Sequence, residues 1–221
     1  MDIILHQILW NYFGQMMGGN KMSITKERKE ILVKQLLVMI NENPDREGLV
    51  GTPDRVVRMW DEIFKGYKKE NEPKVTVFNN GHDGIIYDEM ITDSGDFYSH
   101  CEHHMVPFYG KYFFSYIPHP KGKLLGLSKV ARVVDYFSAK LQVQERLTHE
   151  IINYLWSTLC DKTVCKYPPI AMGLRMEAEH LCKTMRGVKK KGKMTTTQLF
   201  GEFKTHDITR QEFLNWVNKN V

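Results

Sequence analysis

The chain has 221 residues, of which 42% are hydrophobic and 26% are charged, as in an ordinary globular protein. Its 31 basic and 26 acidic residues give a formal net charge of +5, which suits an anionic substrate but does not require nucleic acid. Four scattered cysteines, with no secretory cleavage signal before them, favour metal or free thiols over a disulfide framework. We therefore expect a cytoplasmic protein with a metal site or free thiols.

The first 72 residues are predicted to precede the main domain. Residues 1–22 are apolar and aromatic but too short and interrupted to span a bilayer, so we expect an N-terminal extension, either a peripheral helix or a disordered tail. A docking helix is the alternative. Residues 23–72 are predicted to form a helical region, with one helix over Ser23–Asn41 and a second over Asp54–Gly66 that follows the cap-like Thr52 and Pro53.

Residues 73–221 are predicted to form the main domain, of class α+β with a mainly antiparallel sheet, because strand patterns surround a pair of helices. Apolar spacing predicts the two helices over Leu127–Ala139 and Gln142–Leu159. Strands are expected from β-prone or alternating residues between turn signals, at Lys74–Phe78, Ile85–Thr92, Asp96–His100, Tyr109–Ile117, Ile170–Ala178 and Thr195–Phe203.

The stretch Ser99–Phe108 is the most informative in the chain, because it holds three histidines, a cysteine and a carboxylate. Cys101 and His104 stand three residues apart, a spacing at which a thiolate and an imidazole can reach one ion from a tight turn. Two ligands do not make a site, and the best third candidate is Cys182. The alternative is that buried thiols and a hydrogen-bonded histidine simply pack there.

Other chemistry-bearing residues have both a functional and a structural interpretation. His103 and His180 are candidates for proton transfer, although a histidine beside a metal turn is more often a supporting or surface residue. Glu145 opens a helix, where it either accepts paired N–H donors such as a guanine edge or is simply solvated. Several cations would suit a polyphosphate if they converge: Lys129, Arg132, Arg186 and the run Lys189–Lys193.

Four separated motifs, in order, resemble the GTP cyclohydrolase I family, and the similarity runs from about Asp45 to Phe203. They are Ser99–Phe108, Gly126–Arg132, Leu141–Thr148 and Glu179–Val188. The resemblance implies hydrolytic opening of the GTP imidazole ring, release of C8 as formate, and rearrangement of the ribose to 7,8-dihydroneopterin triphosphate. This would be the first step towards tetrahydrofolate, a pterin cofactor or a deazapurine.

The resemblance also assigns roles by motif position. Cys101, His104 and Cys182 would hold zinc, which activates water to attack C8. His103 would be the acid/base group at N7, and His180 would assist proton transfers near the ribose. Glu145 and Gln144 would read the guanine edge, Ser128 would contact the sugar, and Lys129, Arg132 and Arg186 would grip the triphosphate.

The fold that the resemblance implies is the tunnelling fold, an antiparallel four-stranded sheet backed by two long helices. Subunits would close into a five-membered barrel, two barrels would stack into a homodecamer, and the sites would lie between subunits. The sequence departs from the family pattern at Phe113 and over Gly192–Gln198, which affects the expected phosphate pocket and regulatory contacts.

Two rival functions remain open from sequence. One is an enzyme of the same fold that stops at ring opening or acts on another purine or pterin. The other is a zinc-stabilised nucleic-acid-binding module, which requires a closed site with Cys160 or Cys165 as fourth ligand. The sequence has no stretch of alternating aromatic and basic residues that would form a base-stacking surface. We therefore expect neither a nucleic-acid nor a membrane partner.

Overall fold

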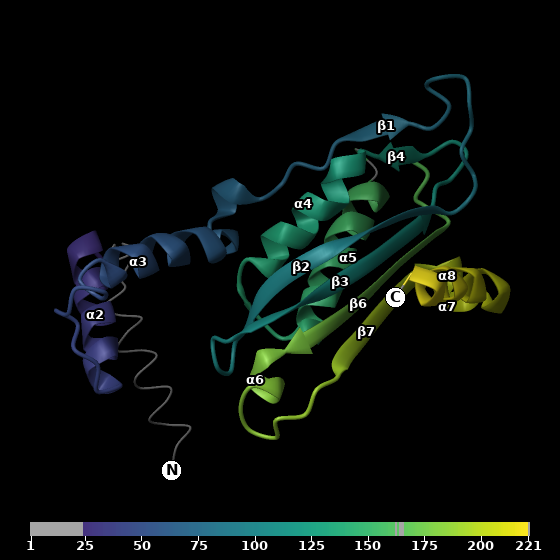
Figure 1. Cartoon of the computed structure of the whole chain (residues 1–221). Coiled ribbons are helices and arrows are strands. Elements are labelled where there is room, and N and C mark those ends of the chain that lie inside the picture. The colour runs from purple at the N-terminus through teal and green to yellow at the C-terminus, as the bar shows by residue number, and fades with distance from the viewer. Residues whose placement is uncertain (1–23, 162, 164–165, 221) are drawn as a thin grey trace, which may run out of the picture. The chain divides into compact units, whose positions relative to one another are not determined.

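The computed structural model describes residues 24–161, 163 and 166–220 (Figure 1). The extension predicted for residues 1–22 lies outside these residues. The chain divides into two compact units, one ending at Glu62 and the other beginning at Ile63. The domain boundaries predicted from sequence stay a prediction.

The first unit contains the two expected helices. Helix α2 spans Lys26–Met39 and begins at Thr25, whose side chain accepts a hydrogen bond from the Arg28 backbone N–H, as an N-cap should. Helix α3 spans Thr52–Ile63, and the 3-10 helix η1 follows it at Lys65–Tyr67. Within this unit Val33 and Val57 are buried, while α2 exposes a series of apolar side chains, Ile31, Leu32, Leu36 and Met39.

The second unit is built on a five-stranded sheet with the order β5-β2-β3-β6-β7. The four long strands pair antiparallel, and they are β2 (Ile91–Cys101), β3 (Pro107–Ile117), β6 (Ala171–His180) and β7 (Lys193–Gly201). The α+β prediction is confirmed. The sheet is mixed, however, because the short strand β5 (Leu141–Gln142) pairs parallel to β2.

Both edges of this sheet are largely open in the described chain. On one side β7 pairs only with β6, and on the other β5 covers only the end of β2, at His100 and Cys101. A separate two-stranded sheet joins β1 (Val77–Asn79) to β4 (Lys123–Leu125). The remaining short helices are η2 (Lys69–Asn71), α6 (Leu181–Thr184) and α7 (Glu202–Thr205).

Helices α4 (Leu127–Ser138) and α5 (Gln144–Cys160) pack against one face of the sheet (Figure 1). They contribute apolar side chains one helical turn apart, which meet alternate residues of β3 because side chains of a strand alternate between faces. The core that results includes Val133, Val134, Leu147, Ile151, Ile152 and Leu155 from the helices, and Phe108, Tyr112, Phe114 and Tyr116 from β3.

Phe113 belongs to a second core on the other face of the sheet. There it packs with Phe203 of α7 and with Phe213 and Val217 of α8 (Asp207–Asn220). Its interplanar angle to Trp216 is 78°, an edge-to-face contact. The aromatic residue at this departure from the family pattern therefore anchors the C-terminal helix.

We expect Phe213→Ala to destabilise the protein by about 3–5 kcal/mol, because a fully buried phenyl ring is lost and a cavity is left. Denaturant-induced unfolding of the wild type and variant would measure the difference. Ile208→Ala is the matched control, since Ile208 lies on the same helix but is 80% exposed. Equal effects from the two substitutions would contradict the packing of α8 described above.

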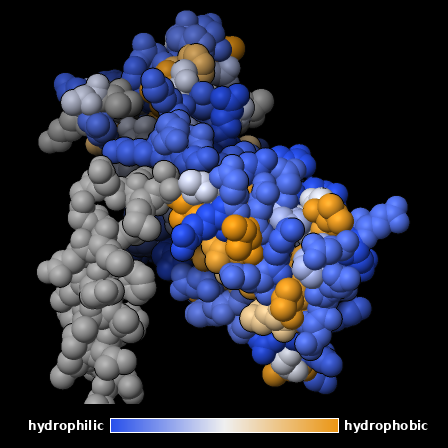
Figure 2. All heavy atoms as spheres, turned by 90° about the vertical axis from the view of Figure 1, so that its left-hand side faces the viewer, coloured by the Kyte–Doolittle hydropathy of each residue, from blue (hydrophilic) through white to orange (hydrophobic). Residues whose placement is uncertain are grey.

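Most of the surface in Figure 2 is hydrophilic, and the hydrophobic residues form separate patches. No helix in the described part of the chain has the length and apolar character needed to cross a membrane.

Candidate metal centre and active site

Three potential metal ligands meet where β2 and β6 end. Cys101 is the last residue of β2, His104 lies in the β2–β3 turn, and Cys182 lies in α6 directly after β6. Their ligand atoms all lie within 4.8 Å of one another, and Sγ of Cys101 is 3.9 Å from Nδ1 of His104. The pairing of β3 with β6, in which Phe108 is opposite His180, brings these distant segments to one end of the sheet (Figure 1).

The chemistry of this group fits a zinc ion. Two thiolates and an imidazole are ligands that zinc prefers, and its bond lengths of about 2.0–2.3 Å place neighbouring tetrahedral ligand atoms roughly 3.3–3.8 Å apart. The separations in the group need close only slightly to reach that range. Among the described residues no fourth histidine, cysteine or carboxylate joins the group, so one position would stay open.

The environment of the two thiols also suits a cation. Burial raises the pKa of the Cys182 thiol, and the neighbouring Cys101 raises it further. Two thiols held this close are costly to ionise together, since a low-dielectric site disfavours adjacent negative charges. A divalent cation would compensate both thiolates.

Backbone hydrogen bonds fix the turn that carries His104. The N–H of Cys101 donates to the Val106 carbonyl over 2.9 Å, and the N–H of Met105 donates to the Cys101 carbonyl over 2.8 Å. Met105 has a φ of 55°, in the left-handed region that a non-glycine residue adopts only when surrounding contacts impose it. Cys101 and His104 are therefore held by a tight, internally bonded turn.

His103 lies beside the metal group but outside it. Its side chain is exposed, and its Nδ1 lies 3.7 Å from Sγ of Cys101. The ring contacts that of His104 edge to face, at 6.3 Å between centroids. His103 can therefore reach a molecule bound at the open position.

His180 lies one residue before α6, and its ring is held on two sides. It stacks on Phe108 with 4.5 Å between ring centroids and 3° between planes, and its Nε2 lies 2.8 Å from Oε1 of Gln144. Burial lowers the pKa of His180, and the nearby Glu145 carboxylate opposes this shift. Lowering the pKa favours the neutral imidazole at neutral pH.

Gln144, which was predicted to read the guanine edge, is buried. Its side-chain amide forms hydrogen bonds to other residues of the chain. Nε2 lies 3.0 Å from the carbonyl oxygens of both Met176 and Met194, and 3.1 Å from Oγ1 of Thr196. The adjacent Glu145 is exposed in the first turn of α5, where a carboxylate is favoured by the helix dipole.

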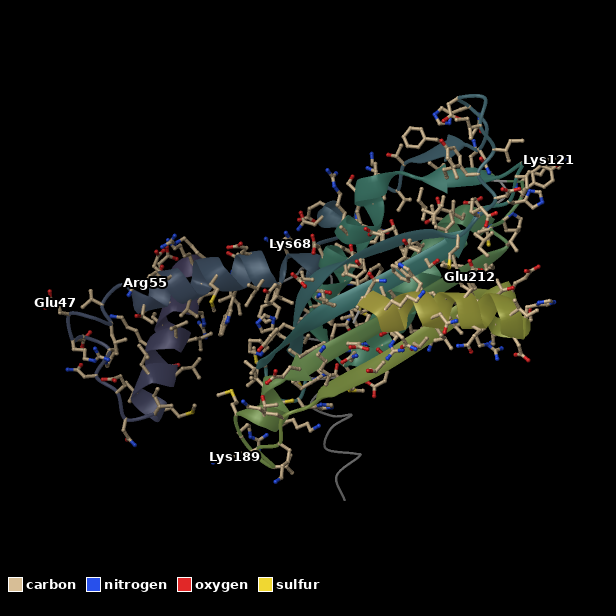
Figure 3. The ribbon with its side chains drawn as sticks, turned by 45° about the vertical axis from the view of Figure 1, so that its right-hand side comes forward. Glu47, Arg55, Lys68, Lys121, Lys189 and Glu212 are labelled. Atoms are coloured by element: carbon tan, nitrogen blue, oxygen red, sulfur yellow. The ribbon has the colours of Figure 1, made fainter. Side chains whose placement is uncertain are left out.

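The other predicted substrate residues lie on separate elements. Ser128, Lys129 and Arg132 are on α4, where Arg132 lines a cavity of about 240 Å³ together with Lys65 and Asp135. Arg186 is exposed just after α6. Figure 3 shows Lys189 in the loop between α6 and β7, at the end of the sheet opposite Lys121. The structure does not gather all the cations into one cluster within this chain.

Comparison with known proteins identifies the family. Residues 29–218 match the sequence profile of GTP cyclohydrolase I. Proteins named GTP cyclohydrolase 1 from Acetivibrio thermocellus and Caldanaerobacter subterraneus subsp. tengcongensis are 44% and 43% identical over 197 residues, which cover 88% of this chain and 98% of each relative. One from Streptococcus pyogenes is 43% identical over 200 residues, 90% of this chain and 96% of the relative.

The chain belongs to the GTP cyclohydrolase I family.

In this GTP cyclohydrolase I chain, sequence reasoning missed the residue that ties the metal turn to α5. Arg146 donates through Nη2 to the carboxylate of Glu102, in the turn, and through Nε to Oε1 of Gln142 over 2.9 Å. The hydrogen bond from Arg146 lowers the pKa of Glu102. The Glu102 N–H also donates to the Gln142 carbonyl over 3.0 Å. The sequence signal for such an ion pair is an acidic residue within the metal motif and a basic residue in the Leu141–Thr148 motif.

We expect Arg146→Ala to weaken metal binding by about 10- to 100-fold, because groups that orient metal ligands commonly have effects of this size. Competition with a chromogenic zinc chelator would measure the affinity. Arg210→Ala is the control, since Arg210 bonds Phe203 and Asp207 far along the chain. Unchanged affinity in the Arg146 variant would mean that the turn holds its shape without this anchor.

Proposed function

We propose that Cys101, His104 and Cys182 bind zinc and that the chain hydrolyses GTP to 7,8-dihydroneopterin triphosphate and formate. The observation that carries this proposal is the three-ligand group, which no fourth ligand joins among the described residues, in a chain of the GTP cyclohydrolase I family. Bound zinc with an open position supplies Lewis acidity and makes water a nucleophile at neutral pH. The product would feed tetrahydrofolate, pterin or deazapurine synthesis.

We infer that the two histidines have different tasks. His103 is exposed next to Cys101, so it can donate a proton to N7 of a purine whose C8 lies at the open position. His180 has a ring locked by Phe108 and Gln144, so it can exchange a proton near the ribose without reorienting. Both tasks need an imidazole that gains and loses a proton near neutral pH.

The substrate itself would be recognised by charge and hydrogen bonding. The exposed Glu145 carboxylate can accept two N–H groups from the guanine edge. Ser128 would contact the sugar, and Lys129, Arg132 and Arg186 would bind the triphosphate. The formal net charge of +5 favours encounter with this anion.

We also propose a cytoplasmic homodecamer of two stacked pentamers, with the sheets closed into barrels of the tunnelling fold and the sites shared between subunits. The open sheet edges and the exposed apolar side chains of α2 support an assembly. It would also bring cations from neighbouring subunits to one site, which this chain alone does not do. Light scattering should give about ten times the chain mass of 25.9 kDa. A monomeric mass would count against the assembly.

The direct test is to incubate the metal-replete protein with GTP and to assay formate together with an oxidisable, fluorescent pterin. Both products are expected in equal amounts. Metal-loaded protein that yields neither would refute the proposed function. Formate without the pterin would instead favour the rival enzyme that stops at ring opening.

A further inference from the structure

We propose that Gln144 is a positioning residue that fixes the ring orientation and the tautomer of His180, and that it does not contact the guanine base. This inference rests on the proposed role of His180 in proton transfer. It replaces the guanine-reading role that the sequence motif suggested for Gln144. The argument starts from the hydrogen bonds of the Gln144 amide.

The acceptors around Gln144 determine which way its amide faces. Two carbonyl oxygens, those of Met176 and Met194, each lie 3.0 Å from Nε2. A carbonyl oxygen can only accept, so the NH₂ end must face them, and the reversed amide would set Oε1 against two oxygens. The orientation of Gln144 is therefore fixed by strands β6 and β7.

With the NH₂ group committed, Oε1 is the atom that faces His180. An amide oxygen can only accept, so Nε2 of His180, 2.8 Å away, must carry the hydrogen. In the neutral ring the lone pair then belongs to Nδ1. Among the described residues no hydrogen bond occupies Nδ1 of His180, so this nitrogen is available to a ligand.

The surroundings of Gln144 prevent its amide from turning towards a ligand. The residue is 1% exposed. Oγ1 of Thr196 accepts from Nε2 over 3.1 Å and lies 2.6 Å from Oγ1 of Thr148, which in turn donates to the Gln144 carbonyl over 2.8 Å. Reading a guanine edge would break several of these bonds in a buried site, where an unpaired polar group is costly.

The stacking of His180 on Phe108 completes the arrangement. The two rings are 3° from parallel, so Phe108 sets the plane of the imidazole while Gln144 sets its rotation within that plane. A hydrogen-bond partner on one ring nitrogen determines the role of the other. Gln144 would thereby present Nδ1 of His180 in the one state that can accept a proton.

The decisive measurement is the tautomer of His180 in the zinc-loaded protein, from ¹⁵N chemical shifts of labelled histidine rings, assigned with a His180→Gln variant. We expect the Nε2–H form in the wild type and a mixture of tautomers in Gln144→Ala. An Nδ1–H form in the wild type would overturn the proposal. Because this readout does not depend on turnover, it tests Gln144 even if the protein fails to convert GTP.

Kinetics with GTP and inosine triphosphate provide the second test, because inosine lacks the 2-amino group of guanine. Gln144→Ala should lower kcat by about 10- to 100-fold, the range for residues that orient a functional group, and leave KM within about twofold. The preference for GTP should stay unchanged. An increased KM together with a lost preference for GTP would instead show that Gln144 reads the base.

Two further variants keep the test decisive if Gln144→Ala does not fold. Thr196→Val removes only one acceptor of the Gln144 amide, and we expect a smaller decrease in kcat, with KM and base preference unchanged. Glu145→Gln is the contrasting variant, because it should raise KM for GTP and reduce the preference over inosine triphosphate. If Thr196→Val leaves both kcat and the His180 tautomer at wild-type values and Gln144→Ala is unfolded, the proposal fails.

Discussion

A Cys182→Ala variant is expected to lose bound zinc and GTP turnover together. Cys182 is the only ligand in the group that comes from α6, so its removal leaves just the two ligands of the β2–β3 turn. Two ligands do not hold zinc against dialysis, and we expect the affinity to fall by more than about 100-fold. Metal content after dialysis, measured beside formate release, would test this.

Cys160→Ala is the matched control for that experiment, because it removes a thiol that is not part of the metal group. It should retain one zinc per chain and wild-type turnover. Zinc retained by Cys182→Ala would mean that another residue completes the site. The rival nucleic-acid module needs a fourth protein ligand, so it predicts instead that either Cys160→Ala or Cys165→Ala also loses metal.

His103→Ala is expected to retain zinc while turnover falls by about 10²- to 10⁴-fold, the usual contribution of a general acid/base group. The structural reason is that His103 lies outside the three-ligand group yet beside Cys101. Zinc content and the rate of formate release, measured on the same preparation, separate metal binding from catalysis.

His104→Ala is the comparison, since it should lose zinc and activity together. Comparing the two variants is a strict test, because both histidines lie close to Cys101. Nδ1 of His103 is 3.7 Å from Sγ of Cys101, and Nδ1 of His104 is 3.9 Å from it. The two histidines differ in their distance from the second thiol. Of the two, only His104 has a ring nitrogen within 4.8 Å of the sulfur atoms of both Cys101 and Cys182. Loss of zinc from His103→Ala would therefore reverse the assignment of ligand and proton donor.

Much of the fold could be predicted because local patterns matched the final packing. The alternation along Ile170–Ala178 predicts a strand, and β6 spans Ala171–His180. The apolar spacing of Leu127–Ala139 predicts a helix, and α4 ends one residue earlier, at Ser138. In both segments the period of the apolar residues is set by the core that they cover.

The predicted elements were wrong in two segments, where contacts distant in sequence decide the backbone conformation. A strand was expected over Ile85–Thr92, but β2 begins only at Ile91, and Ile85 and Ile86 are 58% exposed. The loop before β2 is held instead by Asn80, whose side chain bonds the backbone N–H and carbonyl of Tyr87. The second segment is Gln142, which was predicted to begin a helix but lies in β5, because its backbone joins the end of β2.

At the candidate site, the sequence identified residue types but not their partners. Cys101 and His104 are close in sequence, so their proximity could be predicted from a turn. Nothing local could indicate that the Gln144 amide meets Met176 and Met194, because those contacts depend on the pairing of β6 with β7. Under the roles proposed above, the motif around Gln144 would contain residues for positioning as well as for recognition, and only the packing distinguishes them.

In the proposed homodecamer, the open edges of the sheet would couple the folding of this chain to its assembly. Along β7 every second backbone N–H and carbonyl faces away from β6, and these groups must bond either water or a strand of another copy. Closing such edges between chains makes stability depend on protein concentration, since association is governed by mass action. Dilution should therefore lower the melting temperature, and synthesis at low levels should favour degradation or aggregation of unassembled chains.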